Sequence, residues 1–481
     1  MPARAAFSAI RSRRVRLSFS LLLLSLFAVL IGIRACTLGV RATYHHAASY
    51  NEGWNTYYSH YAAVGHPLYG TKPQRLATNY PPISFHLEAA LGRLLGDLNF
   101  AGRIISIVAF IWVATCTGFT VRLATGESWA AISATFFCVA WFSPFAPYNI
   151  GVNDPQMLAH ALMLTGVVLY AASERSTPIL VASCVFFCIG GFTKHSLLAF
   201  PLAVTLDILW RSRLRFAFWI GTAAVTLTLL ALLTLWVDGP YLLEHLLSPR
   251  RYLPSRALFI SSIFFRIYLP GLVLSTIWCL TAARRSRARF LALALPISLL
   301  VGVAFAGGSG VSVNVLYDAW IAIAMIAAMV LADAIAIARK GSLRTSAVAI
   351  VAVAIASAVP ILAGFYSAVP PRAVLAQEDR VYAQDVAYLK NRPGPAICFD
   401  LLLCYEAGKP LFYEPFATGE RIATGRLDPN VIASELANLK YSVIQTDQGV
   451  TYFPPTVLDA LNSHYRIDRQ SALSVFYVPL P

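Results

Sequence analysis

The sequence predicts an all-α polytopic membrane domain of about eleven transmembrane helices, followed by a small α/β domain outside the membrane. Of the 481 residues, 58% are hydrophobic and only 13% are charged, and the mean hydropathy is +0.63. Globular chains carry roughly a quarter charged residues, so one soluble core cannot hide this much apolar surface. The net charge of +15 comes from arginines in short clusters between apolar runs. That distribution is typical of cytoplasmic loops rather than of a nucleic-acid-binding surface, and we expect no nucleic-acid partner.

The N-terminal segment predicts an uncleaved membrane anchor. Several arginines before residue 17 precede an apolar run over residues 17–33. A cleaved signal peptide has a similar pattern, but this run is long. In addition, Arg34 stands two residues before Cys36, where a lipoprotein cleavage site needs small apolar residues. An anchor with its N-terminus in the cytoplasm places the first outer loop, residues 37–103, outside.

Residues 83–95 predict a helix lying in the membrane interface. They form an apolar stretch that His86, Glu88 and Arg93 interrupt. Thirteen helical residues rise only about 20 Å, which is short of the ~30 Å hydrocarbon core. We therefore expect this helix to lie along the outer surface of the membrane instead of crossing it.

Ten further apolar runs predict the remaining spans. They cover residues 104–121, 129–148, 156–173, 179–193, 196–210, 216–237, 260–282, 290–306, 314–337 and 345–366. With residues 83–95 in the interface, every arginine cluster between these runs faces the cytoplasm. If that helix crossed the membrane, all of the clusters would face outward, against the positive-inside tendency. The transmembrane domain is therefore predicted to be residues 1–366.

Residues 367–481 predict an extracytoplasmic α/β domain. Apolar segments at 396–399, 441–444 and 473–478 alternate with helical patterns at 431–439 and 456–463. Cys398 and Cys404 lie in this tail and are able to pair in an oxidising compartment, but the sequence leaves open whether they do. Cysteines within the spans are expected to pack as small apolar residues.

Short motifs resemble polytopic glycosyltransferases of the GT-C fold. Tyr50-Asn51-Glu52-Gly53-Trp54-Asn55 stands near the start of the first outer loop, and Asn79-Tyr80-Pro81-Pro82 precedes the interfacial helix. Asp154 follows at the outer end of the third span. In pattern the chain is similar to the bacterial aminoarabinose transferases and the protein O-mannosyltransferases. Tail segments 405–410 and 413–416 also look like the outer domain of uncharacterised bacterial members.

The resemblance implies transfer of a hexosyl or pentosyl unit from a polyprenyl-phosphate donor to a glycan, lipid or protein acceptor. The reaction is expected on the outer face of a bacterial inner (plasma) membrane. In these families an acidic residue of the first loop acts as, or supports, the base that activates the acceptor. Their commonest pattern is Asp-Glu, whereas this chain reads Asn51-Glu52, so the assignment of the base falls on Glu52.

The residues themselves suggest the same chemistry. A carboxylate within hydrogen-bond reach of the attacking hydroxyl raises the rate by roughly 10²–10⁴. Glu52 is the predicted base, although it would also suit a helix N-terminus as a cap. Asp154 is predicted to orient the acceptor or to hold a cation, and its alternative role is to cap the helix that Pro155 starts. If a divalent cation such as Mg²⁺ or Mn²⁺ takes part, Glu52 and Asp154 are its expected ligands.

A lipid phosphate as leaving group needs a nearby positive charge. Lys194 is the first candidate, because a lysine near the membrane is costly unless it has a partner. Its alternative is to snorkel to the outer headgroups. Further candidate phosphate ligands are Arg250, Arg251 and Arg266. The predicted cavity lining consists of Asn51, Tyr80, His86, His195 and Asn314.

Two other classes of function remain alternatives. A secondary transporter or flippase of lipid-linked sugars would share the membrane domain, but such proteins show internal repeats and broken helices at the membrane midplane. The sequence has no internal repeat, and its polar residues gather on one side of the membrane. A receptor with a ligand-binding tail would leave the motifs around Glu52 and Asp154 unexplained. An enzyme acting at the outer surface is the preferred interpretation.

Overall fold

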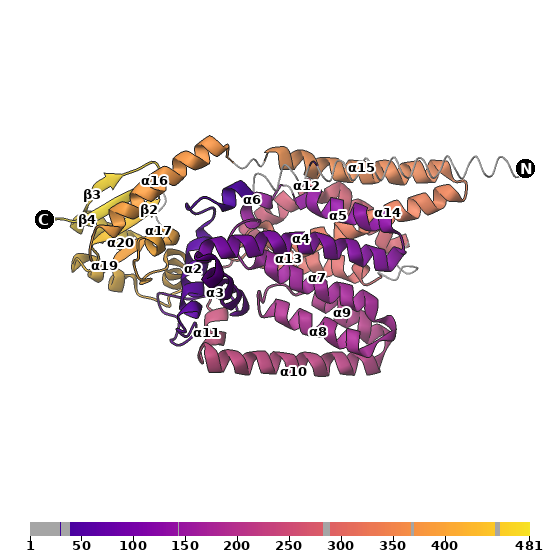
Figure 1. Ribbon diagram of the computed structural model, residues 1–481, viewed down its shortest axis with the longest axis horizontal. Helices are drawn as coiled ribbons and strands as arrows, with labels where there is room; N and C mark the ends of the chain where they lie inside the picture. The colour runs from indigo at the N-terminus through magenta and orange to yellow at the C-terminus, as the bar shows by residue number, and fades with distance from the viewer. Residues whose placement is uncertain (1–28, 30–38, 143, 282–288, 367–369, 448–452) are drawn as a thin grey trace, which may run out of the picture.

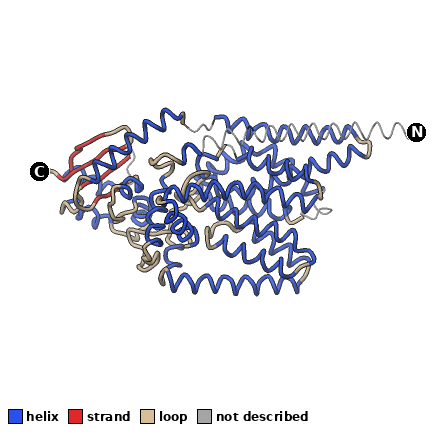
Figure 2. The backbone as a smooth tube through the Cα atoms, viewed as in Figure 1, coloured by secondary structure: helices blue, strands red, loops and turns tan. Residues whose placement is uncertain are grey.

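The computed structural model describes residue 29 and residues 39–142, 144–281, 289–366, 370–447 and 453–481. The predicted anchor at residues 17–33 lies almost wholly outside these ranges. A long helical domain and a smaller domain near the C-terminus lie end to end (Figure 1). Among the described residues, the strands lie in the smaller domain (Figure 2).

The ten apolar runs after residue 103 each correspond to a helix. These are α4 (Leu98–Thr125), α5 (Ser128–Phe142), α7 (Gln156–Ala172), α8 (Thr177–Gly191), α9 (Ala199–Arg211), α10 (Arg213–Val237), α12 (Pro254–Thr281), α13 (Leu291–Ala306), α14 (Tyr317–Arg339) and α15 (Leu343–Tyr366). Short elements connect them: α6 (Ala146–Asn149), η1 (Ser173–Arg175), α11 (Leu242–Leu246) and η3 (Val313–Leu316). In the described residues, six helices are long and apolar enough to cross a membrane: α4, α7, α10, α12, α14 and α15. The chain is thus a multi-pass membrane protein, while the count of eleven spans stays a prediction.

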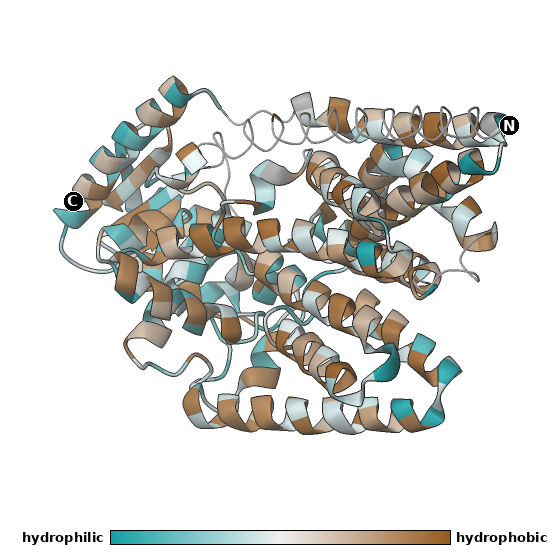
Figure 3. Cartoon of the chain, turned by 45° about the vertical axis from the view of Figure 1, so that its right-hand side comes forward, coloured by the Kyte–Doolittle hydropathy of each residue, from teal (hydrophilic) through white to brown (hydrophobic). Residues whose placement is uncertain are grey.

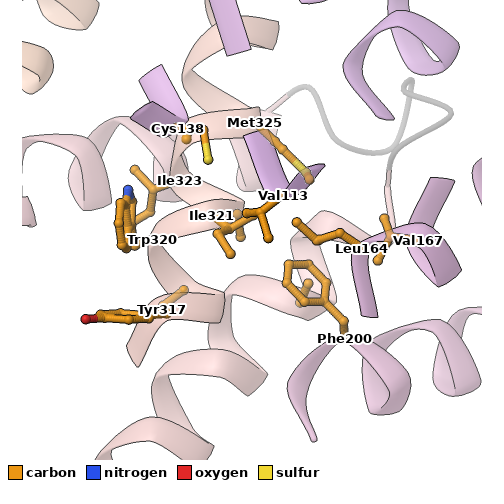
Figure 4. Close-up of a cluster of buried hydrophobic side chains, with 14 of the residues drawn as sticks. Val113, Cys138, Leu164, Val167, Phe200, Tyr317, Trp320, Ile321, Ile323 and Met325 are labelled. Carbon is orange, nitrogen blue, oxygen red and sulfur yellow. The ribbon is translucent and has the colours of Figure 1, made fainter. Parts of the chain in front are cut away.

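Helix α14 forms the centre of the helical domain. Its residues from Tyr317 to Met329 are all buried, and it packs against α4, α5, α12, α13 and α15. A helix that is apolar on every side is expected in a core of this kind. Figure 4 shows Trp320 and Ile321 of this helix among side chains from its neighbours. The N-terminal end of α14 follows directly on η3 (Val313–Leu316) and contacts it.

Helix α10 has the opposite surroundings. Only Trp219 and Thr234 are buried along it, and its exposed side chains are mostly apolar. It forms one edge of the helical domain (Figure 3). Such an exposed apolar surface is suited to contact with lipid.

The first outer loop contains α2 (Tyr50–Ala63) and α3 (Ile83–Leu95). The bounds of α3 match the predicted interfacial helix, although its position in the membrane interface stays a prediction. Ser49 caps α2 by accepting the N–H of Asn51, and Glu52 reaches back to the N–H of Ala48. This Ser-x-x-Glu arrangement approximates a capping box, so the helix-capping alternative for Glu52 has a structural basis.

The tail forms the predicted α/β domain. Its elements are α16 (Arg372–Lys390), β1 (Ala396–Cys398), α17 (Leu401–Glu406), α18 (Pro415–Ala423), α19 (Pro429–Ala437), β2 (Val443–Asp447), α20 (Pro455–His464), β3 (Tyr465–Gln470) and β4 (Ser474–Pro479). The strand order is β1-β2-β4-β3, with β1 and β2 parallel and the other pairs antiparallel. Cys398 and Cys404 form a disulfide with their Cα atoms 5.9 Å apart. The pairing of these two cysteines, which the sequence left open, is therefore present in the structure.

The tail is packed directly on α2. A Cβ atom on Gly53 would lie 2.3 Å from the backbone nitrogen of Leu402, so only glycine permits this approach of α17. The Tyr57 hydroxyl donates to the carbonyl of Lys409 at 2.6 Å, and Arg75 pairs with Glu435 at 2.6 Å. The helix that carries Asn51 and Glu52 therefore also positions the tail.

Candidate functional site

Glu52 joins the start of α2 to the loop before α7. Arg103 of α4 binds its carboxylate through two parallel bonds of 2.7 Å, from Nε and from Nη2. The backbone N–H groups of Ala48 and Asn153 donate to the same carboxylate at 2.7 and 3.0 Å. Both side chains of the ion pair are buried. Glu52 therefore fixes the backbone N–H of Asn153, the residue before Asp154.

The electrostatics of Glu52 keep it ionised. Burial alone would raise the pKa of Glu52, but the Arg103 guanidinium and the two backbone N–H groups hold that pKa below its usual value. A carboxylate with four strong donors has few lone pairs left for another partner.

Asp154 lies in a looser polar cluster. Its Oδ2 accepts from the Asn51 amide at 2.8 Å and from the Tyr80 hydroxyl at 3.4 Å. Its Oδ1 accepts from the N–H of Gln156 at 2.8 Å and faces the Lys194 ammonium at 3.4 Å. The short bond to Gln156 is the helix-capping role that the sequence offered as an alternative. The two 3.4 Å contacts are long for hydrogen bonds and leave the carboxylate easier to approach than that of Glu52.

Lys194 and Tyr80 complete this cluster. The Lys194 ammonium lies 3.3 Å from the Tyr80 hydroxyl and 4.6 Å from the centre of its ring. Burial alone would lower the pKa of Lys194, but Asp154 and Tyr80 raise it above its usual value, so the ammonium stays charged. Burial and Asp154 raise the pKa of Tyr80, which keeps its hydroxyl a donor. The partner of Lys194 within the protein is thus the carboxylate of Asp154.

Arg250 and His195 stand near the cluster. The Arg250 guanidinium lies over the Phe416 ring of the tail, 5.1 Å from its centre. Burial lowers the pKa of His195 to about 4, and the positive charges of Lys194 and Arg250 add to this effect. The positive charge of Arg250 also lowers the pKa of Tyr80, against the larger effect of burial. Positive charge from two separate loops therefore converges on the space beside Tyr80.

The other residues predicted to bind phosphate or to line the cavity have different surroundings. Arg251 pairs with Glu420 of the tail at 2.8 Å, and His86 contacts Asp238 at 3.0 Å. Asn314 donates to the side chain of Gln156 at 2.9 Å, which connects η3 to the helix after Asp154. Arg266 is exposed on α12, away from the buried face of that helix.

The sequence does not single out two residues of the site. Arg103 stands at the end of the predicted first outer loop, and only the folded chain brings it to Glu52, 51 positions earlier.

Glu88 interrupts the apolar pattern of α3. Its carboxylate accepts from Ser59 at 2.5 Å and from the Asn153 amide at 3.0 Å in the orientation that satisfies both side chains. Burial raises the pKa of Glu88 to about 8. The sequence feature that points to Glu88 is a carboxylate on a face of α3 that the apolar pattern predicts to be buried.

The described part of the chain offers no group of three or more His, Cys, Asp or Glu side chains placed to hold a metal ion. The predicted pair of ligands, Glu52 and Asp154, comes from adjoining elements. The Glu52 carboxylate is, however, directed at Arg103.

Comparison with known proteins gives a clear result for the fold. No protein-family model and no curated protein matches the sequence. The structure has the GT-C fold of polytopic glycosyltransferases, as the motifs predicted. It matches ArnT from Cupriavidus metallidurans bound to undecaprenyl phosphate with a TM-score of 0.62, over 96% of this chain and 98% of that chain, at 13% identity. The apo state of the same enzyme gives 0.63 over 94% and 97%, at 12% identity.

A more distant likeness reaches the Archaeoglobus fulgidus oligosaccharyltransferase in its apo form. The TM-score is 0.54 over 89% of this chain and 69% of that chain, at 12% identity. At these identities the comparisons establish the fold, and the activity has to be argued from the site.

Proposed function

We propose that this protein is a membrane glycosyltransferase that moves a sugar from a polyprenyl-phosphate donor to an acceptor on the outer face of the membrane. The observation that carries the proposal is the buried cluster of Asp154, Tyr80 and Lys194 at the outer ends of the helices. The ArnT structure with the same fold is bound to undecaprenyl phosphate, which supports a lipid phosphate as the donor carrier.

In this proposal Asp154 is the base. The acceptor hydroxyl gives its proton to the Asp154 carboxylate while its oxygen bonds to the anomeric carbon of the sugar. The bond from that carbon to the phosphate oxygen breaks, and polyprenyl phosphate leaves. The long contacts of Asp154 favour it over Glu52, because a carboxylate with weaker partners is more readily approached by a hydroxyl.

Lys194 and Arg250 take the part of the cation at the leaving group. When a phosphate binds beside Tyr80, the Lys194 ammonium can turn from Asp154 towards it, and Asp154 is then free to accept a proton. A fixed positive charge beside the developing phosphate charge stabilises the transition state. Glu52 is assigned a positioning role, since it holds the N–H of Asn153 and with it the direction of Asp154.

The orientation of the chain belongs to the same proposal. The N-terminus is placed in the cytoplasm of a bacterial cell and the tail in the periplasm or outside the cell. The acceptor is a glycan, a lipid or a protein. The Cys398–Cys404 disulfide supports the outer location of the tail, because disulfides persist in oxidising compartments.

The test is sugar transfer in proteoliposomes that contain the full chain and labelled polyprenyl-phosphate hexoses or pentoses. Asp154→Asn should lower kcat by at least 100-fold with little change in the KM for the donor. Lys194→Met should raise the KM for the donor and lower kcat, because the leaving phosphate loses its counter-charge. Asn462→Asp, an exposed change at the far end of α20, serves as the control.

Normal transfer by the Asp154 and Lys194 variants at equal protein level would refute the assigned roles. Uptake or flipping of the lipid-linked sugar without a glycosylated product would support the transporter instead.

A further inference from the structure

A hollow lies between the tail and the loops at Arg251 and Ser309, apart from the Asp154 cluster. Its volume is about 390 Å³, and its lining includes Arg251, Ser309, Phe416, Glu420, Ala423 and Phe453. Pockets that bind small molecules in proteins have volumes of about 300–1,000 Å³. The hollow is therefore large enough for a small ligand or for one unit of a larger one.

One wall of this hollow is polar and preorganised. Glu420 is buried and accepts from the Nε and Nη2 of Arg251 and from the hydroxyl of Ser309 at 2.8 to 3.2 Å. The backbone N–H of Arg251 donates to the same carboxylate at 2.8 Å. The remaining guanidinium nitrogen of Arg251, Nη1, has no hydrogen-bond partner in the described ranges, and its side chain is half exposed. The wall thus offers a fixed donor whose position the ion pair determines.

The rest of the lining is apolar and aromatic. Phe416 packs on the backbone of Gly310, where a Cβ atom would lie 2.4 Å from the ring. Phe453, Pro454 and Ile422 add further apolar surface. A pyranose ring has one face of C–H groups, which packs on aromatic carbon, and an edge of hydroxyls, which hydrogen bonds to charged donors. A site that combines aromatic side chains with an arginine fits a sugar better than it fits a lipid chain.

The hollow is connected to the candidate catalytic cluster through few contacts. The backbone N–H of Phe416 donates to the Tyr50 hydroxyl at 3.2 Å, and the next residue, Asn51, donates to Asp154 at 2.8 Å. Arg250 covers the Phe416 ring and brings positive charge towards Tyr80. A ligand in the hollow would therefore lie next to the elements that hold the cluster.

We propose that this hollow between α18 and the loop at Arg251 binds a sugar residue of the acceptor, and so selects a glycan as the acceptor. The role of the hollow in acceptor choice rests on the proposed glycosyltransferase function. Binding of a sugar in the hollow is measurable without any transfer. The proposal assigns to the tail a role in choosing the acceptor, while the donor binds elsewhere.

The experiment blocks the hollow in protein that is already folded. Ala423 lines the hollow and is exposed, so Ala423→Cys can be labelled with benzylmaleimide after the full chain has been placed in nanodiscs. Asn462→Cys, exposed at the other end of α20, is labelled in the same way as the matched control. Binding of the methyl glycosides of glucose, galactose, mannose and N-acetylglucosamine is followed by saturation-transfer NMR.

We expect at least one glycoside to bind to the wild type and to the labelled Asn462→Cys protein. Labelling of Ala423→Cys should weaken this binding at least tenfold and leave binding of polyprenyl phosphate unchanged. Equal binding by the two labelled proteins, or no binding of any glycoside to the wild type at millimolar concentration, would overturn the proposal. Sugar binding in the hollow of a protein without transferase activity would keep the sugar site but remove the proposed function, and with it the role of the hollow in choosing an acceptor. Normal transfer with an unchanged acceptor KM after labelling of Ala423→Cys would do the reverse.

Discussion

The buried pair of Glu52 and Arg103 provides a direct test of which carboxylate is the base. Their side chains are 0% and 2% exposed, and two bonds of 2.7 Å join them. Removing one partner from such a pair leaves an unpaired buried charge, which costs about 3–5 kcal/mol of folding free energy. Glu52→Gln and Arg103→Gln should each destabilise the protein by this amount. The double variant removes both charges of the pair, so it should recover about 1–3 kcal/mol relative to the sum of the single changes.

Activity distinguishes the two possible roles of Glu52. If Glu52 only positions the loop before Asp154, the two amide groups of the double variant can still hydrogen bond to each other. The kcat of the double variant should then be at least tenfold higher than the kcat of Glu52→Gln. A base at Glu52 would instead leave the double variant as inactive as Glu52→Gln. The measurements are thermal unfolding in detergent and transfer kinetics in proteoliposomes at equal protein level. A stable double variant without any recovery of kcat would refute the positioning role.

Single contacts support three more expectations. Burial raises the pKa of Glu88 from its ordinary 4.5 to about 8, so the folded state keeps a proton that the unfolded chain loses. Its contribution to stability is therefore present below pH 4.5 and declines by about 1.4 kcal/mol per pH unit as the pH rises towards 8. Glu88→Gln should flatten this decline in thermal unfolding between pH 5 and 8, and parallel pH profiles would contradict the assignment. Gly53→Ala should lower the melting temperature and kcat together, because its methyl group meets the backbone of Leu402, whereas Gly221→Ala, with open space around its Cβ, should leave both intact. Cys398→Ser should destabilise the tail by about 2 kcal/mol, as expected for opening a short disulfide loop, and an unchanged melting curve under non-reducing conditions would argue against the bond.

The features set by local pattern were predictable from the sequence. Helix α3 follows from thirteen apolar-patterned residues, and its bounds were predicted correctly. The strands near residues 397, 444 and 476 follow from short apolar segments, whereas β3 alternates too many exposed polar residues to be recognised. Pairings between distant positions were not predictable, because a charge in the sequence does not reveal its partner.

The three arginines of the predicted phosphate group show this limit. They have the same chemistry, yet Arg250 lies near the cluster, Arg251 binds Glu420 of the tail, and Arg266 stands exposed on α12. Asp154 and Lys194 lie 3.4 Å apart, and both stand at ends of neighbouring apolar runs that the sequence predicts to face the outer side of the membrane. Their roles stay predictions. The role of Glu52 was harder to judge, since its dominant contact is with a residue of another helix.

Asn51 offers a last test of the role of the Asp154 carboxylate. Its amide donates to Asp154 at 2.8 Å, so Asn51→Asp would replace a donor by a second carboxylate against the first. Two carboxylates at this distance cannot both ionise without a cation between them, and one of the two pKa values must rise. We expect the acidic limb of the pH–kcat profile to move to higher pH and the variant to respond to Mg²⁺ or Mn²⁺ more strongly than the wild type does. Asn51→Ala, which removes the donor without adding charge, is the matched control and should lower kcat without the pH shift. If Asn51→Asp kept the wild-type pH profile and the wild-type response to cations, the Asp154 carboxylate would not be the group whose ionisation the reaction requires.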